Sequence, residues 1–226
     1  MRKQLLFLTA FVAGNAWASD HNNLEPARPL RVEDAYSIAF GEREFQSGFG
    51  ITSMKNSRPT YGWLNEFQYG FAKNQDLTIS LDKTFNGSDV NGELSYFRNI
   101  SRELEKAPAF GYRVGISRQG GQSASHLSLV ATKAWHQYDK VHVNLNLDSL
   151  NAPQFILGYS TPVGYPKVFD NTLVSEFVYQ GGTGSAGIGF RRQISSQAVL
   201  DYGIQSNVTG SNGNSVRLVV GYSIGF

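Results

Sequence analysis

Apolar and polar residues alternate along most of this chain with a period of two, which is typical of β-strands with two different faces. In the last segment, 217–226, five apolar residues from Leu218 to Phe226 alternate with small or polar ones and Val219. A strand of this kind that ends on an aromatic residue is typical of bacterial outer-membrane barrels. The pattern therefore predicts one face toward lipid and one toward a polar lumen.

The same alternation recurs along the chain, with turn-forming residues between the segments. It is clearest in 141–148, where four aliphatic residues alternate with His, Asn, Asn and Asp. The pattern predicts an all-β, antiparallel, up-and-down transmembrane β-barrel of about 12 strands, with 10 and 14 as alternatives. The segments are 43–55, 61–71, 77–82, 93–96, 110–117, 127–135, 141–148, 155–159, 173–180, 187–191, 198–205 and 217–226.

The N-terminal residues predict export from the cell. Arg2 and Lys3 precede a short apolar run and the small-residue site at 16–18, so we expect residues 1–18 to be a signal peptide. Residues 19–42 are then a periplasmic leader and residues 43–226 a single barrel domain. The polar, proline-containing stretch 20–30 is expected to be flexible and able to plug the periplasmic mouth in part.

Composition excludes several classes of function. The net charge is +2, which gives no electrostatic reason to expect nucleic acid as a partner. The chain has no Cys and four dispersed His, so we expect no disulfide, no metal site and no cofactor. The glycine-rich stretch 181–184 joins two strands, which indicates a hairpin loop and not a phosphate site.

Ionisable residues on the polar face of the predicted strands are expected to point into the lumen. Isolated charges are costly to bury, so these groups should pair in a network that braces the barrel. A sharper hypothesis is that six of them line a constriction that selects solutes by size and charge: Glu66, Glu93, Arg113, Glu176, Arg191 and Arg217. The full lumen set adds Glu44, Asp82, His126, His142, Asp148 and Asp201.

Aromatic residues near strand ends share the face of Leu, Ile and Val. We expect them to form membrane-interface girdles, and the candidates are Tyr61, Trp63, Trp135 and Tyr222. A ring-stacking track for an aromatic solute is the less favoured interpretation. Tyr222 and Phe226 are candidates for the C-terminal insertion signal, which implies the barrel-assembly machinery as a partner.

One pair of residues raises the alternative of a lipid-modifying enzyme. His126 and Ser128 lie two residues apart, so a strand would place both on one face, as nucleophilic catalysis requires. Leu127 and Leu129 are expected to face the lipid, however, so His126 and Ser128 would point into the lumen, away from a lipid substrate. We therefore expect no enzymatic activity.

The stretches 28–36 and 41–48 resemble the opening of the family named for the MetA pathway of phenol degradation, in which an Asp-Ala pair shortly precedes a Gly-x-x-Glu that starts the first strand. Segments 66–71, 173–176 and 187–191 are also similar to strands of that family. The resemblance implies an outer-membrane barrel that passes small, often aromatic or hydrophobic compounds, and it brings no site residues.

Taken together, the pattern and the resemblance predict a channel for passive passage of small solutes in the outer membrane of a Gram-negative cell. The lipid bilayer and a small-molecule solute are then its partners. A structural barrel without transport is the main alternative.

Overall fold

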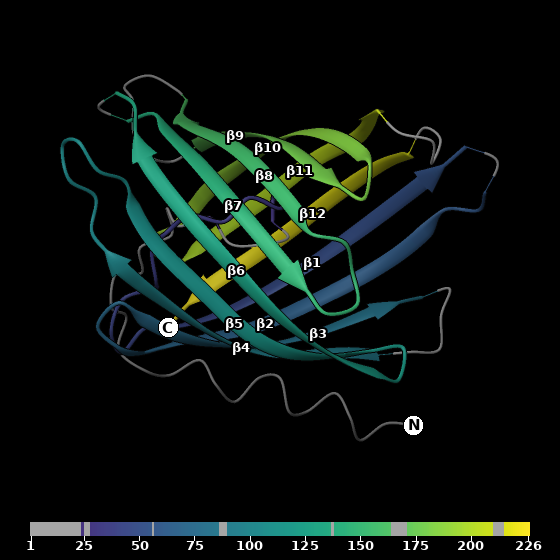
Figure 1. Cartoon of the computed structure of the whole chain (residues 1–226), viewed down its shortest axis with the longest axis horizontal. Helices are drawn as coiled ribbons and strands as arrows, with labels where there is room; N and C mark the ends of the chain where they lie inside the picture. Colours follow the sequence, from purple (N-terminus) through teal and green to yellow (C-terminus); the bar gives the residue numbers. More distant parts are fainter. Residues whose placement is uncertain are drawn as a thin grey trace.

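The computed structural model is a closed barrel of 12 antiparallel strands, which confirms the predicted fold and strand count (Figure 1). It describes residue 24 and residues 28–55, 57–85, 90–136, 138–163, 171–209 and 215–226; the predicted signal peptide lies outside this set. Among these residues, none forms a helix long and apolar enough to cross a membrane. The strands are β1 (Arg43–Met54), β2 (Thr60–Ala72), β3 (Gln75–Thr84), β4 (Val90–Ser101), β5 (Ala109–Gln119), β6 (Gln122–Ala134), β7 (Lys140–Asp148), β8 (Gln154–Pro162), β9 (Asn171–Gln180), β10 (Thr183–Ser195), β11 (Ala198–Thr209) and β12 (Ser215–Gly225).

Each strand pairs with its neighbours in sequence, and β1 pairs with β12 to close the cylinder. Closure leaves no unpaired strand edge, as a lipid environment requires. We call the end that holds Arg43 and Phe226 the inner end. The hairpin loops after β1, β3, β5, β7, β9 and β11 define the opposite, outer end.

Two of the two-residue hairpins are glycine turns at the outer end. Gly120 and Gly121 join β5 to β6, and Gly181 and Gly182 join β9 to β10, all with φ between 54° and 83°. Two successive positive φ values give the turn whose twist matches paired strands, and side-chain-bearing residues rarely adopt them. After the turn at Gly120 and Gly121, β6 begins at Gln122, five residues before the predicted start at 127.

The exterior of the barrel is apolar, as the alternation predicts. Side chains such as Ile79, Leu94, Ile116 and Leu218 are between 46% and 64% exposed, and they alternate along their strands with buried residues. The interior holds most of the buried polar and charged groups. An apolar outer surface around a polar interior is the arrangement that a bilayer stabilises.

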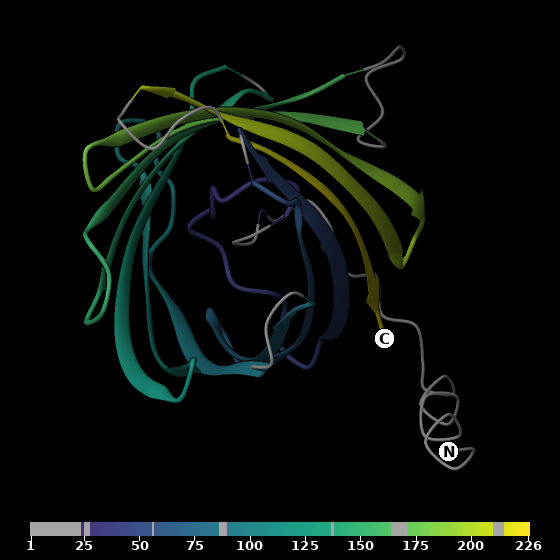
Figure 2. The same ribbon diagram turned by 90° about the vertical axis from the view of Figure 1, so that its right-hand side faces the viewer.

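The interior is not an empty tube, because residues 28–38 lie inside it (Figure 2). We call these residues the luminal leader. The sequence places residues 19–42 at the periplasmic side, with a partial plug at the mouth. In the structure the described part of this region lies against the inner wall of nearly every strand.

Candidate functional site

An ion pair fixes the luminal leader to the barrel wall. Arg113 of β5 donates to the Glu33 carboxylate from Nε at 2.9 Å and from Nη2 at 2.6 Å. The same guanidinium donates to the hydroxyls of Thr78 at 3.1 Å and Ser95 at 3.3 Å. Arg113 and Glu33 are both at least 94% buried, so the pair is stable only because these extra hydrogen bonds accompany it.

Polar side chains of the wall satisfy the leader's backbone. Glu176 of β9 accepts hydrogen bonds from the backbone N–H groups of Arg31 at 2.7 Å and Val32 at 2.8 Å. Asn144 of β7 accepts from Glu33 N at 2.9 Å and donates to Glu33 O at 2.7 Å. Buried backbone groups need such partners, so the wall substitutes for a neighbouring strand.

The leader's apolar side chains also have matching sites on the inner wall. Leu30 and Val32 pack with Ile156, Val174 and Val178 of β8 and β9. Ala35 occupies a second cluster with residues of β4, β5 and β6, namely Phe97, Ala109 and Val130. A lumen meant only for water would not carry these buried apolar residues, so the wall is shaped for the leader.

Glycines on the lumen face make room for the leader. A Cβ on Gly158 would lie 2.3 Å from the Val32 side chain, and one on Gly221 would lie 2.5 Å from that of Arg28. A Cβ on Gly203 would lie 2.5 Å from the backbone oxygen of Pro29. Contacts this short do not occur, so the close approach of leader and wall requires glycine at these positions.

A buried carboxylate holds the bend at the start of the leader. Asp34 accepts hydrogen bonds from Leu24 N at 2.9 Å and Tyr36 N at 3.1 Å. Burial raises the pKa of Asp34 to about 7, although the Lys140 charge and these two N–H groups act in the opposite direction. The leader therefore carries a group that titrates near neutral pH.

At the inner end the leader is attached to a turn between strands. The Tyr36 hydroxyl donates to Glu103 at 3.0 Å, and Lys133 Nζ and Ala134 N donate to the same carboxylate at 2.9 Å and 2.7 Å. Burial alone would raise the pKa of Glu103, but the hydrogen bonds from Lys133 and Ala134 outweigh it and lower that pKa. Glu103 therefore stays ionised and holds the leader at this end.

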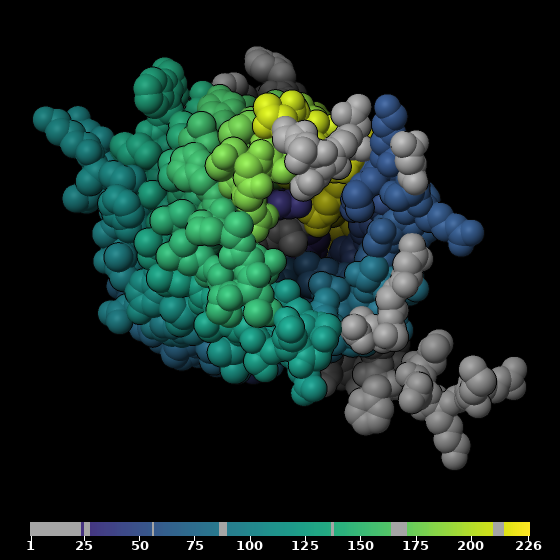
Figure 3. All heavy atoms as spheres, turned by 45° about the vertical axis from the view of Figure 1, so that its right-hand side comes forward, coloured from purple at the N-terminus to yellow at the C-terminus, as the bar shows by residue number. Residues whose placement is uncertain are grey.

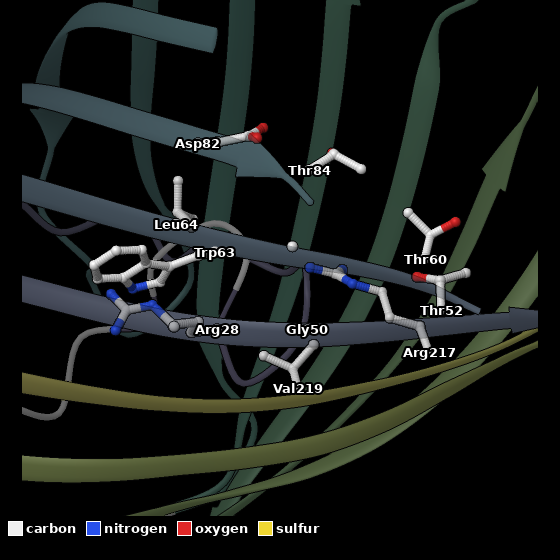
Figure 4. A pocket seen from close by; sticks show the side chains of 12 residues that line it. Arg28, Gly50, Thr52, Thr60, Trp63, Leu64, Asp82, Thr84, Arg217 and Val219 are labelled. Carbon is white, nitrogen blue, oxygen red and sulfur yellow. The ribbon is translucent and has the colours of Figure 1, made fainter. Parts of the chain in front are cut away.

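Two cavities open beside the leader in the outer half of the barrel. The first, of about 260 Å³, lies along β1, β2, β3 and β12 and is lined by Gly50, Gly62, Asp82 and Arg217, with Arg28 at its base (Figure 4). The second, of about 370 Å³, lies along β8 to β11 beside Arg31. Figure 3 shows the hollow at this end of the barrel, with leader atoms in purple inside it. We call this hollow the outer vestibule.

The six predicted lumen residues lie in different surroundings and do not form one ring. Arg113 and Glu176 hold the leader, and Glu66 lies 3.6 Å from the leader's Arg28. Arg191 pairs with Asp201 at 3.0 Å, and Glu93 lies 3.4 Å from His126. Arg217 alone among the six lines the first cavity of the outer vestibule.

The predicted girdle residues all have exposed side chains on the outside. Tyr61, Trp63, Trp135 and Tyr222 are 37% to 73% exposed. Trp63 also donates from Nε1 to the Ser47 hydroxyl at 2.8 Å. Phe226 N donates to Arg43 O at 2.9 Å, so the C-terminal residue takes part in barrel closure.

The geometry of His126 and Ser128 does not favour nucleophilic catalysis. Ser128 donates to Asn146 at 2.7 Å, while His126 is beside Glu93. A second His–Ser pair joins His142 Nε2 and Ser160 Oγ at 2.9 Å. Thr132 Oγ1 accepts from the leader's Ala35 N and lies 3.1 Å from His142 Nδ1. His142 thus bridges the hydroxyls of Thr132 and Ser160, and Thr132 connects it to the leader's backbone, so this pair belongs to the leader's binding site. Among the described residues, no three His, Cys, Asp or Glu side chains could together hold a metal ion.

Sequence reasoning missed most of the leader's binding site. The segment 31–39 was not expected to reach the middle of the lumen, and Phe97, Ile156, Val174 and Val178 were not recognised as lumen-facing. One signal in the sequence could have indicated this site. Glycines and apolar residues occur together on the strand face that the alternation predicts to be polar.

Comparison with solved structures supports the fold. A KdgM porin matches with a TM-score of 0.65 and 8% identity, over 80% of this chain and 99% of that chain. The COG4313 outer membrane channel from Pseudomonas putida F1 matches with a TM-score of 0.59 and 10% identity, over 90% of this chain and all of that chain. Outer membrane phospholipase A from Escherichia coli is less similar, with a TM-score of 0.50 and 15% identity, over 90% of this chain and 96% of that chain.

No family model matches the sequence, and no curated protein does either. The resemblance to the MetA-pathway family is thus not confirmed, whereas the likeness to outer-membrane channel barrels is. An apolar belt around a closed 12-stranded cylinder, shared with such barrels, places this chain in the outer membrane as the sequence predicts.

Proposed function

We propose that the protein is a channel for passive passage of small solutes, with the luminal leader as its constriction. The observation that carries this proposal is the outer vestibule, a polar hollow whose cavities of about 260 and 370 Å³ extend down to the leader. Small barrels of about eight strands fill their interior with side chains of the strands. Here the interior is filled by a separate segment, whose displacement would open the tube.

The lining of the first cavity supports a path for solutes. Gly50 and Gly62 face each other across β1 and β2, and a Cβ on either would meet only one backbone oxygen, at 3.7 Å and 3.8 Å. Unlike the glycines that make room for the leader, these two border open space. They keep the wall thin where a solute would pass the leader.

The nature of the solute is a finer part of the proposal. The resemblance of residues 28–48 to the MetA-pathway family favours small aromatic or hydrophobic compounds, and the similar solved structures include a porin and an outer-membrane channel. The C-terminal strand with Tyr222 and Phe226 is proposed to engage the barrel-assembly machinery during insertion.

Conductance of the purified protein in planar bilayers tests the channel. We expect small wild-type conductance, a lower value for Gly62→Trp, and a higher value when residues 28–39 are deleted. Gly92→Trp is the matched control, because Gly92 pairs with the exposed Leu81 of β3 and lies on the lipid face. Heat-modifiable gel migration would verify that each barrel is folded.

The structural alternative makes a different forecast for the same experiment. If neither the wild type nor the folded, leader-deleted barrel conducts ions, the proposal of a channel fails and the leader is a permanent filling of a structural barrel.

A further inference from the structure

Two arginines of the outer vestibule lack the close carboxylate partners that Arg113 and Arg191 have. Arg31 of the leader and Arg217 of β12 are half-buried, and among the described residues neither guanidinium has a hydrogen bond or an ion pair. Arg113 and Arg191, by contrast, are paired with Glu33 and Asp201. A desolvated guanidinium normally pairs with a carboxylate.

The carboxylate whose charge acts on both arginines is already committed to other donors. Glu176 attracts both Arg31 and Arg217. Its Oε2 accepts the backbone N–H groups of Arg31 and Val32, and its Oε1 accepts from Gln205 at 3.0 Å. Both oxygens are therefore used to fix the leader, and the two guanidinium groups retain their donors.

Contacts around Glu176 bring the two arginines to one place. Gln205 pairs with Arg217 in the register of β11 and β12, and it donates to the Glu176 carboxylate that accepts from Arg31 N. The charge of Arg31 accordingly acts on Arg217. Placing like charges together in a half-buried site costs free energy, which an anion between them would recover. Arg217 extends into the first cavity (Figure 4). Arg31 lines the second cavity, and both cavities belong to the outer vestibule.

We infer that Arg31 and Arg217 form a receptor for a small carboxylate anion in the outer vestibule. Each guanidinium presents a planar set of donors that matches a carboxylate, and the lumen walls reduce competition from water. This inference rests on the proposed function and adds a solute class to it: a small molecule with a carboxylate group, bound before it passes the leader.

Binding of a probe anion tests the receptor separately from conduction. Calorimetric titration of the detergent-solubilised protein with citrate is expected to show saturable binding that weakens with added salt. Arg217→Gln and Arg31→Gln should each reduce the affinity at least tenfold, because a charge-assisted hydrogen bond is lost. Arg31→Gln leaves the leader attached, since Glu176 holds the backbone N–H of that residue.

Arg118→Gln is the matched control, because this substitution removes the same charge at the same end of the barrel. Arg118 of β5 is exposed, whereas its neighbour Ser117 faces the lumen. Arg217→Lys keeps the charge without the planar donors and should bind with intermediate affinity. The inference is overturned if citrate does not bind, or if Arg118→Gln weakens binding as much as Arg217→Gln. Citrate binding by the wild-type protein, with no conductance in either the wild-type or the leader-deleted barrel, would support the receptor and refute the channel. Conductance without citrate binding by the wild type would do the reverse.

Discussion

The ion pair between Glu33 and Arg113 allows the attachment of the luminal leader to be measured. Removing one partner of a buried pair costs about 3–5 kcal/mol, because the remaining charge is left uncompensated. In Glu33→Gln the Arg113 guanidinium keeps its bonds to Thr78 and Ser95, and Asp76 lies 4.0 Å away. We therefore expect the free-energy cost to lie at the lower limit, about 3 kcal/mol. This cost raises the undocked population of the leader about 100-fold.

The absence of native cysteine allows a clean assay of that population. Val32 is 1% exposed, so Val32→Cys would place a thiol that reacts with a membrane-impermeant maleimide only when the leader leaves its site. The labelling rate should rise about 100-fold when Glu33→Gln is added, following the undocked population. Glu105→Gln is the control, because Glu105 is exposed in the turn between β4 and β5.

Equal labelling rates in the Glu33→Gln and Glu105→Gln proteins, with both barrels folded by heat-modifiable migration, would refute this reasoning. The leader would then be held by its apolar contacts and backbone hydrogen bonds alone. A loss of folded barrel in Glu33→Gln would show instead that the leader is needed to build the wall, in contrast to the separate segment that we describe.

Three further predictions concern the leader and the barrel end. Gly203→Ala should raise maleimide labelling in the Val32→Cys protein at least fivefold, because its Cβ would lie 2.5 Å from the backbone oxygen of Pro29 and overpacking costs about 1–3 kcal/mol, whereas Gly50→Ala should leave it unchanged. Burial raises the pKa of Asp34 to about 7 in the docked leader. Between about pH 4 and pH 7 the docked leader therefore binds a proton that the free leader has released. Docking is strongest below about pH 4 and weakens as the pH rises to 7. Because maleimide reacts with the thiolate, each labelling rate is divided by that of the exposed Glu105→Cys protein at the same pH. This ratio should be higher at pH 8 than at pH 5, and a persistent difference in Asp34→Asn would assign it to other groups. Phe226→Ala should lower the yield of folded barrel in outer-membrane fractions. The Phe226 ring centroid lies 6.3 Å from that of Phe67, and Phe226 N donates to Arg43 O where β1 and β12 close the barrel. A yield equal to that of Phe110→Ala would contradict this prediction.

The sequence by itself determined the wall of the barrel. Alternation is a local property of each strand, because successive side chains point to opposite faces whatever their neighbours are. Residues such as Leu145 and Ile204 are therefore assigned to the lipid face, and Asn144 and Gln205 to the lumen, without knowledge of the tertiary structure. The count of such segments then led to 12 strands and to closure.

Only the tertiary structure decided what fills the lumen. The leader's site combines Arg113 of β5, Asn144 of β7, Gly158 of β8 and Glu176 of β9, which are far apart in sequence and meet only when the barrel closes. A period of two indicates that these residues face inward, but it contains no information about what they touch there. For the same reason the pattern does not separate a charge that is paired, such as Arg191, from one that faces an open cavity, such as Arg217. That difference depends on distances across the lumen, which strand pairing and the leader set together.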